Sequence, residues 1–131
     1  MVIDTSAILA LLLLEDEAHE IAAAIADDPV RLISAATLLE SAIVIESRHG
    51  VDGAEKLDRL AEAGGFQVEP VTEKQVRLAR LAYRQYGKGR HPASLNFGDC
   101  FAYALAKSTG QPLLFKGNDF SKTDLQPVLD V

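Results

Sequence analysis

Four acidic residues lie beside apolar stretches of this 131-residue sequence, where carboxylates are unusual. They are Asp4, Glu40, Asp99 and Asp119. An unpaired carboxylate against a core costs on the order of several kcal/mol, so a group of them calls for a positive partner. Mg²⁺ and Mn²⁺ accept carboxylate oxygens and water in octahedral geometry, and a site without Cys or His ligands argues against zinc. If the four side chains meet in the fold, the pattern indicates a site for one or two such ions.

The chemistry that this site would support is hydrolysis of a phosphodiester. Divalent ions polarise a phosphoryl oxygen and lower the pKa of a bound water, and a pair of ions stabilises the entering and leaving oxygens. Three of the acids also have a simpler interpretation when taken alone, and Glu40 does not. Asp4 and Asp99 precede or begin helical stretches, where the helix dipole favours a carboxylate, and Asp119 follows Gly and Asn as turn residues do.

Short strands that alternate with helices must position these acids. Strands are predicted at 2–3, 30–33, 66–71 and 111–115, with a possible fifth at 125–129. Helices are predicted over 7–14, 16–26, 34–48, 52–63, 72–86 and 96–108, several of them with capping residues at their starts. This alternation is typical of the α/β class. We expect one domain, residues 1–131, folded as a three-layer α/β/α sandwich around a central parallel sheet of four to five strands.

The order of the elements predicts where the acids meet. In open parallel sheets, ligands bind beyond the carboxyl ends of the strands. Asp4 follows the first predicted strand and Asp119 follows the fourth. Asp99 begins a helix, and Glu40 lies two turns into the helix that follows the second strand. All four are therefore expected at the same edge.

Composition narrows the classes of function. The formal net charge of −6 excludes a generally basic surface that coats nucleic acid. The longest apolar run, Ala7 to Leu14, has eight residues, far fewer than the roughly 20 that cross a bilayer. The start of the sequence has no basic leader with a cleavage site, so we expect a cytoplasmic protein without a membrane partner. A single cysteine, Cys100, excludes an internal disulfide.

Three segments resemble a known family. They are MVIDTSAILALL at the start, TLLESAIVI in the predicted third helix, and LNFGDCFAYALAKSTGQPLLFKGNDF near the end. Together with the chain length they resemble PIN-domain ribonucleases, particularly VapC-type toxins of toxin–antitoxin pairs, and the resemblance covers essentially the whole chain. By this resemblance, Asp4, Glu40, Asp99 and Asp119 take the places of the four metal-site acids of the family. It also implies that the hydroxyl of Thr5 or Ser6 supports the site and that Asn118 helps to orient the last acid.

The resemblance implies a function as well as a fold. It implies an endoribonuclease that depends on Mg²⁺ or Mn²⁺, that inhibits translation, and that a cognate VapB-like antitoxin holds inactive. It further implies a homodimer. The candidate RNA contacts are Arg84, Lys88, Arg90, His91 and Lys116. The first four form a basic segment before Asp99 that either holds phosphates or is a solvated loop.

Two other interpretations remain open from the sequence. A receiver-like phosphoacceptor signalling domain also combines a carboxylate pocket, Mg²⁺ and an α/β/α sheet. That class requires an acidic pair after the first strand and an acceptor aspartate after a middle strand, whereas this chain has Asp4 alone and Pro70-Val71-Thr72 at those places. The other interpretation is a non-catalytic module that binds RNA or protein, which would bind RNA without cutting it.

Overall fold

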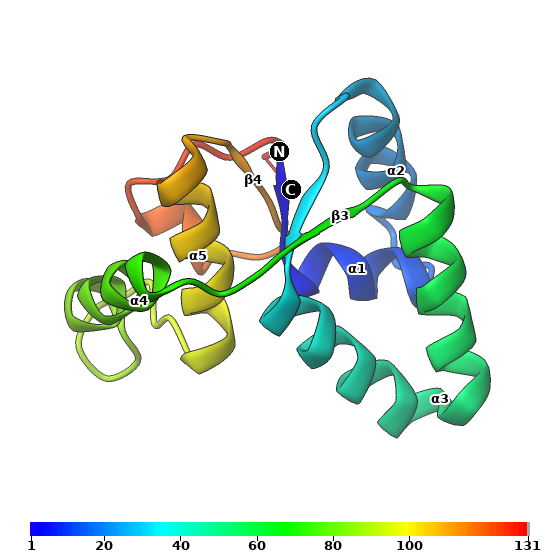
Figure 1. The fold of residues 1–131 in the computed structure, drawn as a ribbon, viewed down its shortest axis with the longest axis horizontal. Helices are drawn as coiled ribbons and strands as arrows, with labels where there is room; N and C mark the ends of the chain where they lie inside the picture. The colour runs from blue at the N-terminus through cyan, green and yellow to red at the C-terminus, as the bar shows by residue number, and fades with distance from the viewer. Residues whose placement is uncertain (131) are drawn as a thin grey trace.

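A parallel sheet with strand order β3-β2-β1-β4 runs through the middle of the protein (Figure 1). Its strands are β1 (Val2–Ile3), β2 (Leu32–Ser34), β3 (Gln67–Glu69) and β4 (Leu113–Leu114). Val2 of the central strand β1 aligns with Leu32 on one side and with Leu113 on the other. The computed structural model describes residues 1–130, so Val131, the last residue of the predicted domain, lies outside the described residues.

Helices cover both faces of this sheet. They are α1 (Thr5–Leu12), α2 (Ala18–Asp27), α3 (Ala35–Ala63), α4 (Glu73–Tyr86) and α5 (Phe97–Thr109), followed by the short 3₁₀ helix η1 (Phe120–Lys122). Successive residues of a strand point to opposite faces. Val2 accordingly packs in the core under α4 and α5, and Ile3 packs in the core under α1, α2 and α3. The predicted three-layer α/β/α sandwich is confirmed. Within residues 1–130, no helix has the length and apolar character needed to cross a bilayer.

Two predicted elements differ from the structure. The segment predicted as a fifth strand, 125–129, contributes only an isolated bridge between Pro127 and Leu113. The bridge consists of the Leu113 N–H donating to the Gln126 carbonyl and the Val128 N–H donating to the Leu113 carbonyl, both at 2.9 Å, and the described sheet keeps four strands. The two helices predicted on either side of Gly50 form the single element α3, which is broken at that glycine by a φ of 62° and a ψ of −153°.

The chain order places a switch point beside β1. From β1 the chain proceeds to β2 and β3 on one side of the sheet, and it later returns to β4 on the other side. Ligand sites of open α/β sheets lie at such a point, beyond the carboxyl ends of the strands. Asp4 directly follows β1, and the segment that leads to Asp119 directly follows β4.

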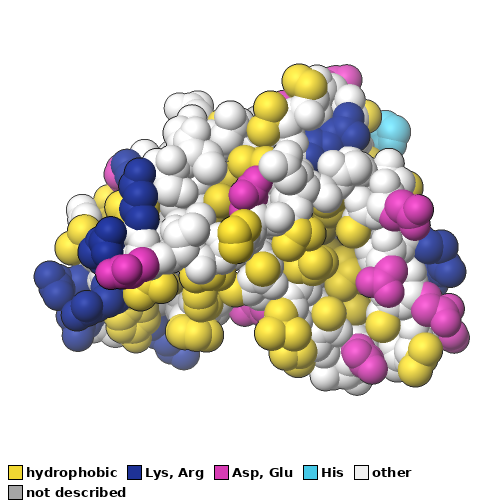
Figure 2. Space-filling view, viewed as in Figure 1, with side chains coloured by type: hydrophobic (Ala, Val, Ile, Leu, Met, Phe, Trp, Pro, Cys, Tyr) yellow, Lys and Arg dark blue, Asp and Glu magenta, His cyan; other side chains and the backbone are white. Residues whose placement is uncertain are grey.

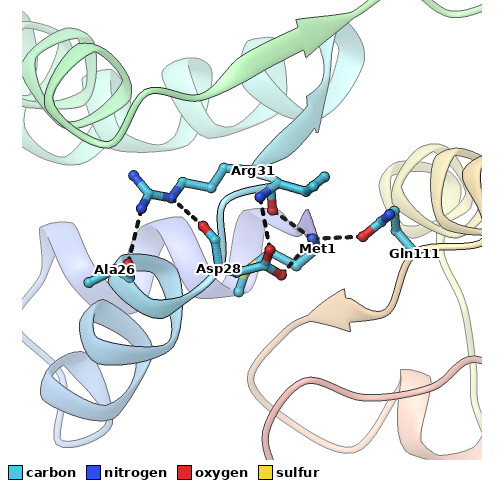
Figure 3. Close-up of polar contacts among 6 residues, drawn as sticks. Met1, Ala26, Asp28, Arg31 and Gln111 are labelled. Atoms are coloured by element: carbon cyan, nitrogen blue, oxygen red, sulfur yellow. Dashed lines mark hydrogen bonds and ion pairs between the residues drawn. The ribbon is translucent and has the colours of Figure 1, made fainter.

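The opposite end of the sheet is closed by polar contacts (Figure 3). The α-amino group of Met1 donates hydrogen bonds to Asp28 Oδ2 at 2.9 Å, to the Val30 carbonyl at 2.6 Å and to Gln111 Oε1 at 3.0 Å. Arg31 donates to the carbonyl of Asp28 and to two further carbonyls, those of Ala26 and Gly64. These bonds join the ends of α2 and α3 to the start of the sheet.

Candidate active site

Asp4 caps α1 and is almost fully buried, with 3% of its surface exposed. Its Oδ2 accepts hydrogen bonds from the Ser6 backbone N–H at 3.0 Å and from Ser6 Oγ at 2.7 Å. Burial raises the pKa of Asp4 to about 6; the Ser6 bonds oppose that rise, and the nearby charge of Glu40 adds to it. Ser6 Oγ also accepts a bond from the Lys116 backbone N–H at 3.0 Å, which ties the start of α1 to the segment after β4.

Glu40 extends from α3 toward the starts of α1 and α5. Its Oε1 accepts a hydrogen bond from Thr5 Oγ1 at 2.5 Å. The Thr5 hydroxyl in turn accepts one from Ser41 Oγ at 3.4 Å. On its other side, the carboxylate lies so close to Gly98 of α5 that a Cβ at position 98 would stand 1.9 Å from Oε2. Glu40 is therefore held between the starts of α1 and α5 while it stays half-buried. Sequence reasoning did not identify Gly98 as the residue that makes room for it.

Asp99 lies in the first turn of α5 and forms a reciprocal capping box with Asn96. The Asp99 N–H donates to Asn96 Oδ1, and Asp99 Oδ2 accepts from the Asn96 N–H, both at 3.0 Å. Burial raises the pKa of Asp99 to about 7, against the Asn96 bond, and the negative charges of Asp4, Asp119 and Glu40 raise it further. This mutual repulsion indicates that the four predicted acids face a common region.

Asp119 is the most open of the four acids and lies exposed just before η1. Its neighbour Asn118 is also exposed, and the Asn118 backbone carbonyl accepts a hydrogen bond from Ser121 Oγ at 2.8 Å. The proposed role of Asn118 in orienting the last acid stays a prediction.

The donor set suits a hard divalent cation, although the carboxylates do not form a ready-made cage. Among residues 1–130, no three acidic, histidine or cysteine side chains lie close enough together to hold a metal ion. Instead, three of the carboxylates accept hydrogen bonds from protein groups: Asp4 from Ser6, Glu40 from Thr5, and Asp99 from the Asn96 N–H. All four donors are carboxylates, and two of them have raised pKa values, so a cation would relieve their repulsion. Metal binding at this edge therefore stays a prediction that requires the side chains to turn toward one ion.

The predicted RNA contacts lie in different surroundings. Arg84, Lys88 and Arg90 are exposed at the end of α4 and in the loop that follows it. His91 packs its ring edge-on against Tyr86, and its Nδ1 accepts a hydrogen bond from the Ala93 N–H at 3.0 Å.

Lys116 points elsewhere. Its ammonium group pairs with Glu15, and with Glu17 at 2.9 Å, in the segment between α1 and α2. The structure thus places its charge against those two acids, while its backbone N–H contacts Ser6 beside the site.

Two grooves border the acidic edge. One, of about 430 Å³, lies between α3 and α5 and includes Glu40 and Gly98 in its lining. The other, of about 690 Å³, lies between α4 and α5. Phe97 and Phe101 line both grooves, and Phe97 has 78% of its surface exposed. Sequence reasoning did not single out this pair; the signal was their i, i+4 spacing on a helix whose core face holds Ala102 and Leu105.

Comparison with known proteins identifies the family. The sequence profile described as the PIN domain matches residues 1–125. The chain belongs to the PIN-domain family. It is 56% identical over 128 residues to Ribonuclease VapC of Mycolicibacterium smegmatis, covering 98% of this chain and 99% of that protein. It is 53% identical over 131 residues to Ribonuclease VapC28 of Mycobacterium tuberculosis, covering 99% of this chain and 98% of that protein. These matches confirm the resemblance to VapC-type PIN-domain toxins and leave the receiver-like interpretation without support.

Solved structures share the PIN fold at low sequence identity. Mycobacterium tuberculosis VapC20, described as a Sarcin-Ricin loop cleaving toxin, superposes with a TM-score of 0.78 at 20% identity, covering 99% of this chain and 97% of that chain. A toxin–antitoxin complex from Klebsiella pneumoniae superposes with a TM-score of 0.71 at 19% identity, covering 99% of this chain and 98% of that chain. The fold of this PIN-domain chain is therefore that of VapC toxins along nearly its whole length.

Proposed function

We propose that this PIN-domain protein is a toxin endoribonuclease that requires Mg²⁺ or Mn²⁺ and that inhibits translation by cutting RNA. The observation that carries the proposal is the position of Glu40, which accepts a hydrogen bond from Thr5, the neighbour of Asp4, and lies against Gly98, the neighbour of Asp99. The ribonuclease names of relatives with more than half of their residues identical support the RNA substrate.

In the proposed reaction, water attacks a phosphodiester phosphorus and the bond to the leaving ribose oxygen breaks. One or two divalent ions held by the four carboxylates would supply positive charge to the phosphate and acidify that water. The protein's own hydroxyl and amide groups each bond one oxygen of three of these acids, and the side chains would turn so that carboxylate oxygens meet one ion. Ser6 holds the carboxylate of Asp4, Thr5 holds that of Glu40, and the backbone of Asn96 holds that of Asp99.

The test compares Asp99→Asn with Asp58→Asn, which makes the same chemical change on the exposed face of α3. We expect purified wild type and Asp58→Asn to cut RNA with Mg²⁺ or Mn²⁺ and to lose activity in EDTA, while Asp99→Asn stays folded and inactive. Sequencing RNA 5′ ends after brief expression then identifies the cut sites. Cleavage at the wild-type rate by Asp99→Asn would refute the site assignment.

We further propose two protein partners, a VapB-like antitoxin and a second copy of this chain. The toxin–antitoxin complex among the structural neighbours supports the first. Inhibition is explained if the antitoxin places a basic side chain among the acids, and a purified complex with full nuclease activity would contradict this.

For the homodimer, the exposed side chains of Leu39 and Ile43 on α3 offer an apolar face. We expect the wild type to sediment as a dimer and Ile43→Asp to sediment as a monomer, and this result would support the homodimer.

A further inference from the structure

The groove between α4 and the start of α5 has the size and chemistry of a nucleotide site. Its volume of about 690 Å³ falls within the roughly 300–1,000 Å³ of small-molecule sites. Its lining consists of Val76, Ala79, Arg80, Tyr83, Arg84, Arg90, Phe97, Cys100 and Phe101. Three residues of this set are arginines and three are aromatic, and none is acidic. A protein with a net charge of −6 therefore concentrates positive charge at this place.

The α4 wall of the groove is a single helix face. Arg80 and Arg84 are four residues apart, so they project from the same side of α4. Arg90 reaches this wall from the following loop, with its guanidinium carbon 6.0 Å from the centroid of the Tyr83 ring. Within residues 1–130, none of these three guanidinium groups forms an ion pair, in contrast to Arg77 on the same helix, which pairs with Glu73 at 2.9 Å. Figure 2 shows dark blue side chains gathered over the α4 side of the molecule with yellow side chains among them.

The α5 wall supplies a stacking surface. The Phe97 ring meets Phe101 edge to face, with centroids 4.9 Å apart, and leaves most of its own surface in solvent. Exposed aromatic rings beside cationic groups are the features with which proteins bind single-stranded nucleic acid, since bases stack on rings and phosphates bind arginines.

The position of this groove links it to the acidic edge. Phe97 lies two residues before Asp99 in the first turn of α5. Phe97 and Phe101 also line the neighbouring groove, which contains Glu40. A strand of RNA can therefore pass from the arginines over the phenylalanine rings to the carboxylates.

We propose that the groove between α4 and α5 binds an unpaired nucleotide of single-stranded RNA next to the bond that is cut. Its base stacks on Phe97, and the neighbouring phosphates bind Arg80, Arg84 and Arg90. The proposal rests on the proposed ribonuclease function and deepens it, because it requires an unstacked, single-stranded segment in the substrate. Complementary charge favours RNA over a protein as the occupant.

The experiment uses a fluorescent oligoribonucleotide that contains 2-aminopurine, whose emission falls when the base stacks. The Asp99→Asn protein binds it without cutting, and further variants are made in that background. We expect Phe97→Leu to remove the quenching and to weaken binding about tenfold, the effect of losing one stacked base. Arg84→Gln should weaken binding and reduce the slope of log affinity against log salt by about 0.7, the loss of one phosphate contact. Arg77→Gln, which makes the same change outside the groove, should bind like its parent.

Any of the following results would overturn the proposal: undiminished quenching in Phe97→Leu, equal losses in Arg84→Gln and Arg77→Gln, or no binding by the parent protein. A dimer that becomes monomeric in Phe97→Leu with unchanged RNA affinity would also overturn it, because the groove would then be a protein interface. Failure of the ribonuclease proposal gives a different result. The protein with Asp99 intact would leave RNA uncut in Mg²⁺ and Mn²⁺ while quenching still depended on Phe97.

Discussion

At the scale of single residues, Asp99 shows that a structural and a chemical role can occupy one side chain. One carboxylate oxygen completes the capping box with Asn96, yet burial and three other acids raise the pKa of the same group to about 7. The three-residue spacing of Asn96 and Asp99 made the cap predictable. The raised pKa depends first on burial and then on Asp4, Glu40 and Asp119, and only folding buries this carboxylate and brings those acids near.

The raised pKa values of Asp4 and Asp99 predict a pH dependence of stability in the metal-free protein. Both folded-state values, about 6 and about 7, lie above the ordinary value of 3.8, so the folded protein binds these protons more tightly than the unfolded chain does. Their contribution to stability is complete below about pH 4 and is lost as pH rises through 6 and 7. In EDTA we expect the urea midpoint of the wild type, relative to that of Asp99→Asn, to fall between pH 5 and pH 7.5. A relative rise over this interval would contradict the assignment.

At the scale of elements, the contact between α3 and α5 sets the position of Glu40. We predict that Gly98→Ala lowers the cleavage rate because its Cβ would stand 1.9 Å from Glu40 Oε2 and push the carboxylate away. Stability should hold, since the carboxylate is the movable end of a side chain and alanine favours a helix by up to about 1 kcal/mol over glycine. Cleavage rates and urea midpoints measured together test this.

Gly53 offers the contrasting control within α3. A Cβ there would lie 2.8 Å from the backbone carbonyl oxygen of Ile45, which cannot move as a side chain does. Gly53→Ala should therefore lower the urea midpoint and leave the cleavage rate per folded molecule unchanged. If Gly98→Ala instead loses stability and keeps its rate, Gly98 serves packing rather than the site.

Most elements were predictable from the sequence because their signals are local. Thr72 and Asn96 cap α4 and α5 as their spacing predicts. Short apolar runs, together with the alternation of apolar and polar residues in 66–71, placed the four strands within a few residues. The fit of Glu40 against Gly98 was not predictable, because it depends on how two helices from distant parts of the chain dock. The pairing of Lys116 with Glu15 and Glu17 has the same origin, since more than 95 residues separate the partners.

At the scale of the whole molecule, the end of the sheet opposite the acids depends on Arg31. Its guanidinium donates to the carbonyls of Ala26 and Asp28 (Figure 3) and to that of Gly64, at 2.8 to 3.1 Å. These bonds connect α2, the start of β2 and the end of α3. We predict that Arg31→Ala lowers the free energy of unfolding by about 2 kcal/mol, since water replaces only part of three charge-assisted bonds. Urea denaturation measures this.

Arg77→Ala is the matched control for that change. Arg77 forms one exposed pair with Glu73 within α4, which is worth about 0.3–0.5 kcal/mol. Equal losses in the two variants would show that Arg31 does not join the elements energetically.

The pairing of β1 with β4 also determines when the acidic edge can form during synthesis of the polypeptide. β1 precedes the other three described strands along the chain, and its neighbour β4 follows them. Ser6, which holds Asp4, receives its bond from Lys116 only after more than a hundred further residues have been added. The growing polypeptide therefore lacks the complete edge until the segment after β4 has been synthesised, so the four acids cannot assemble before Asp119 has been added.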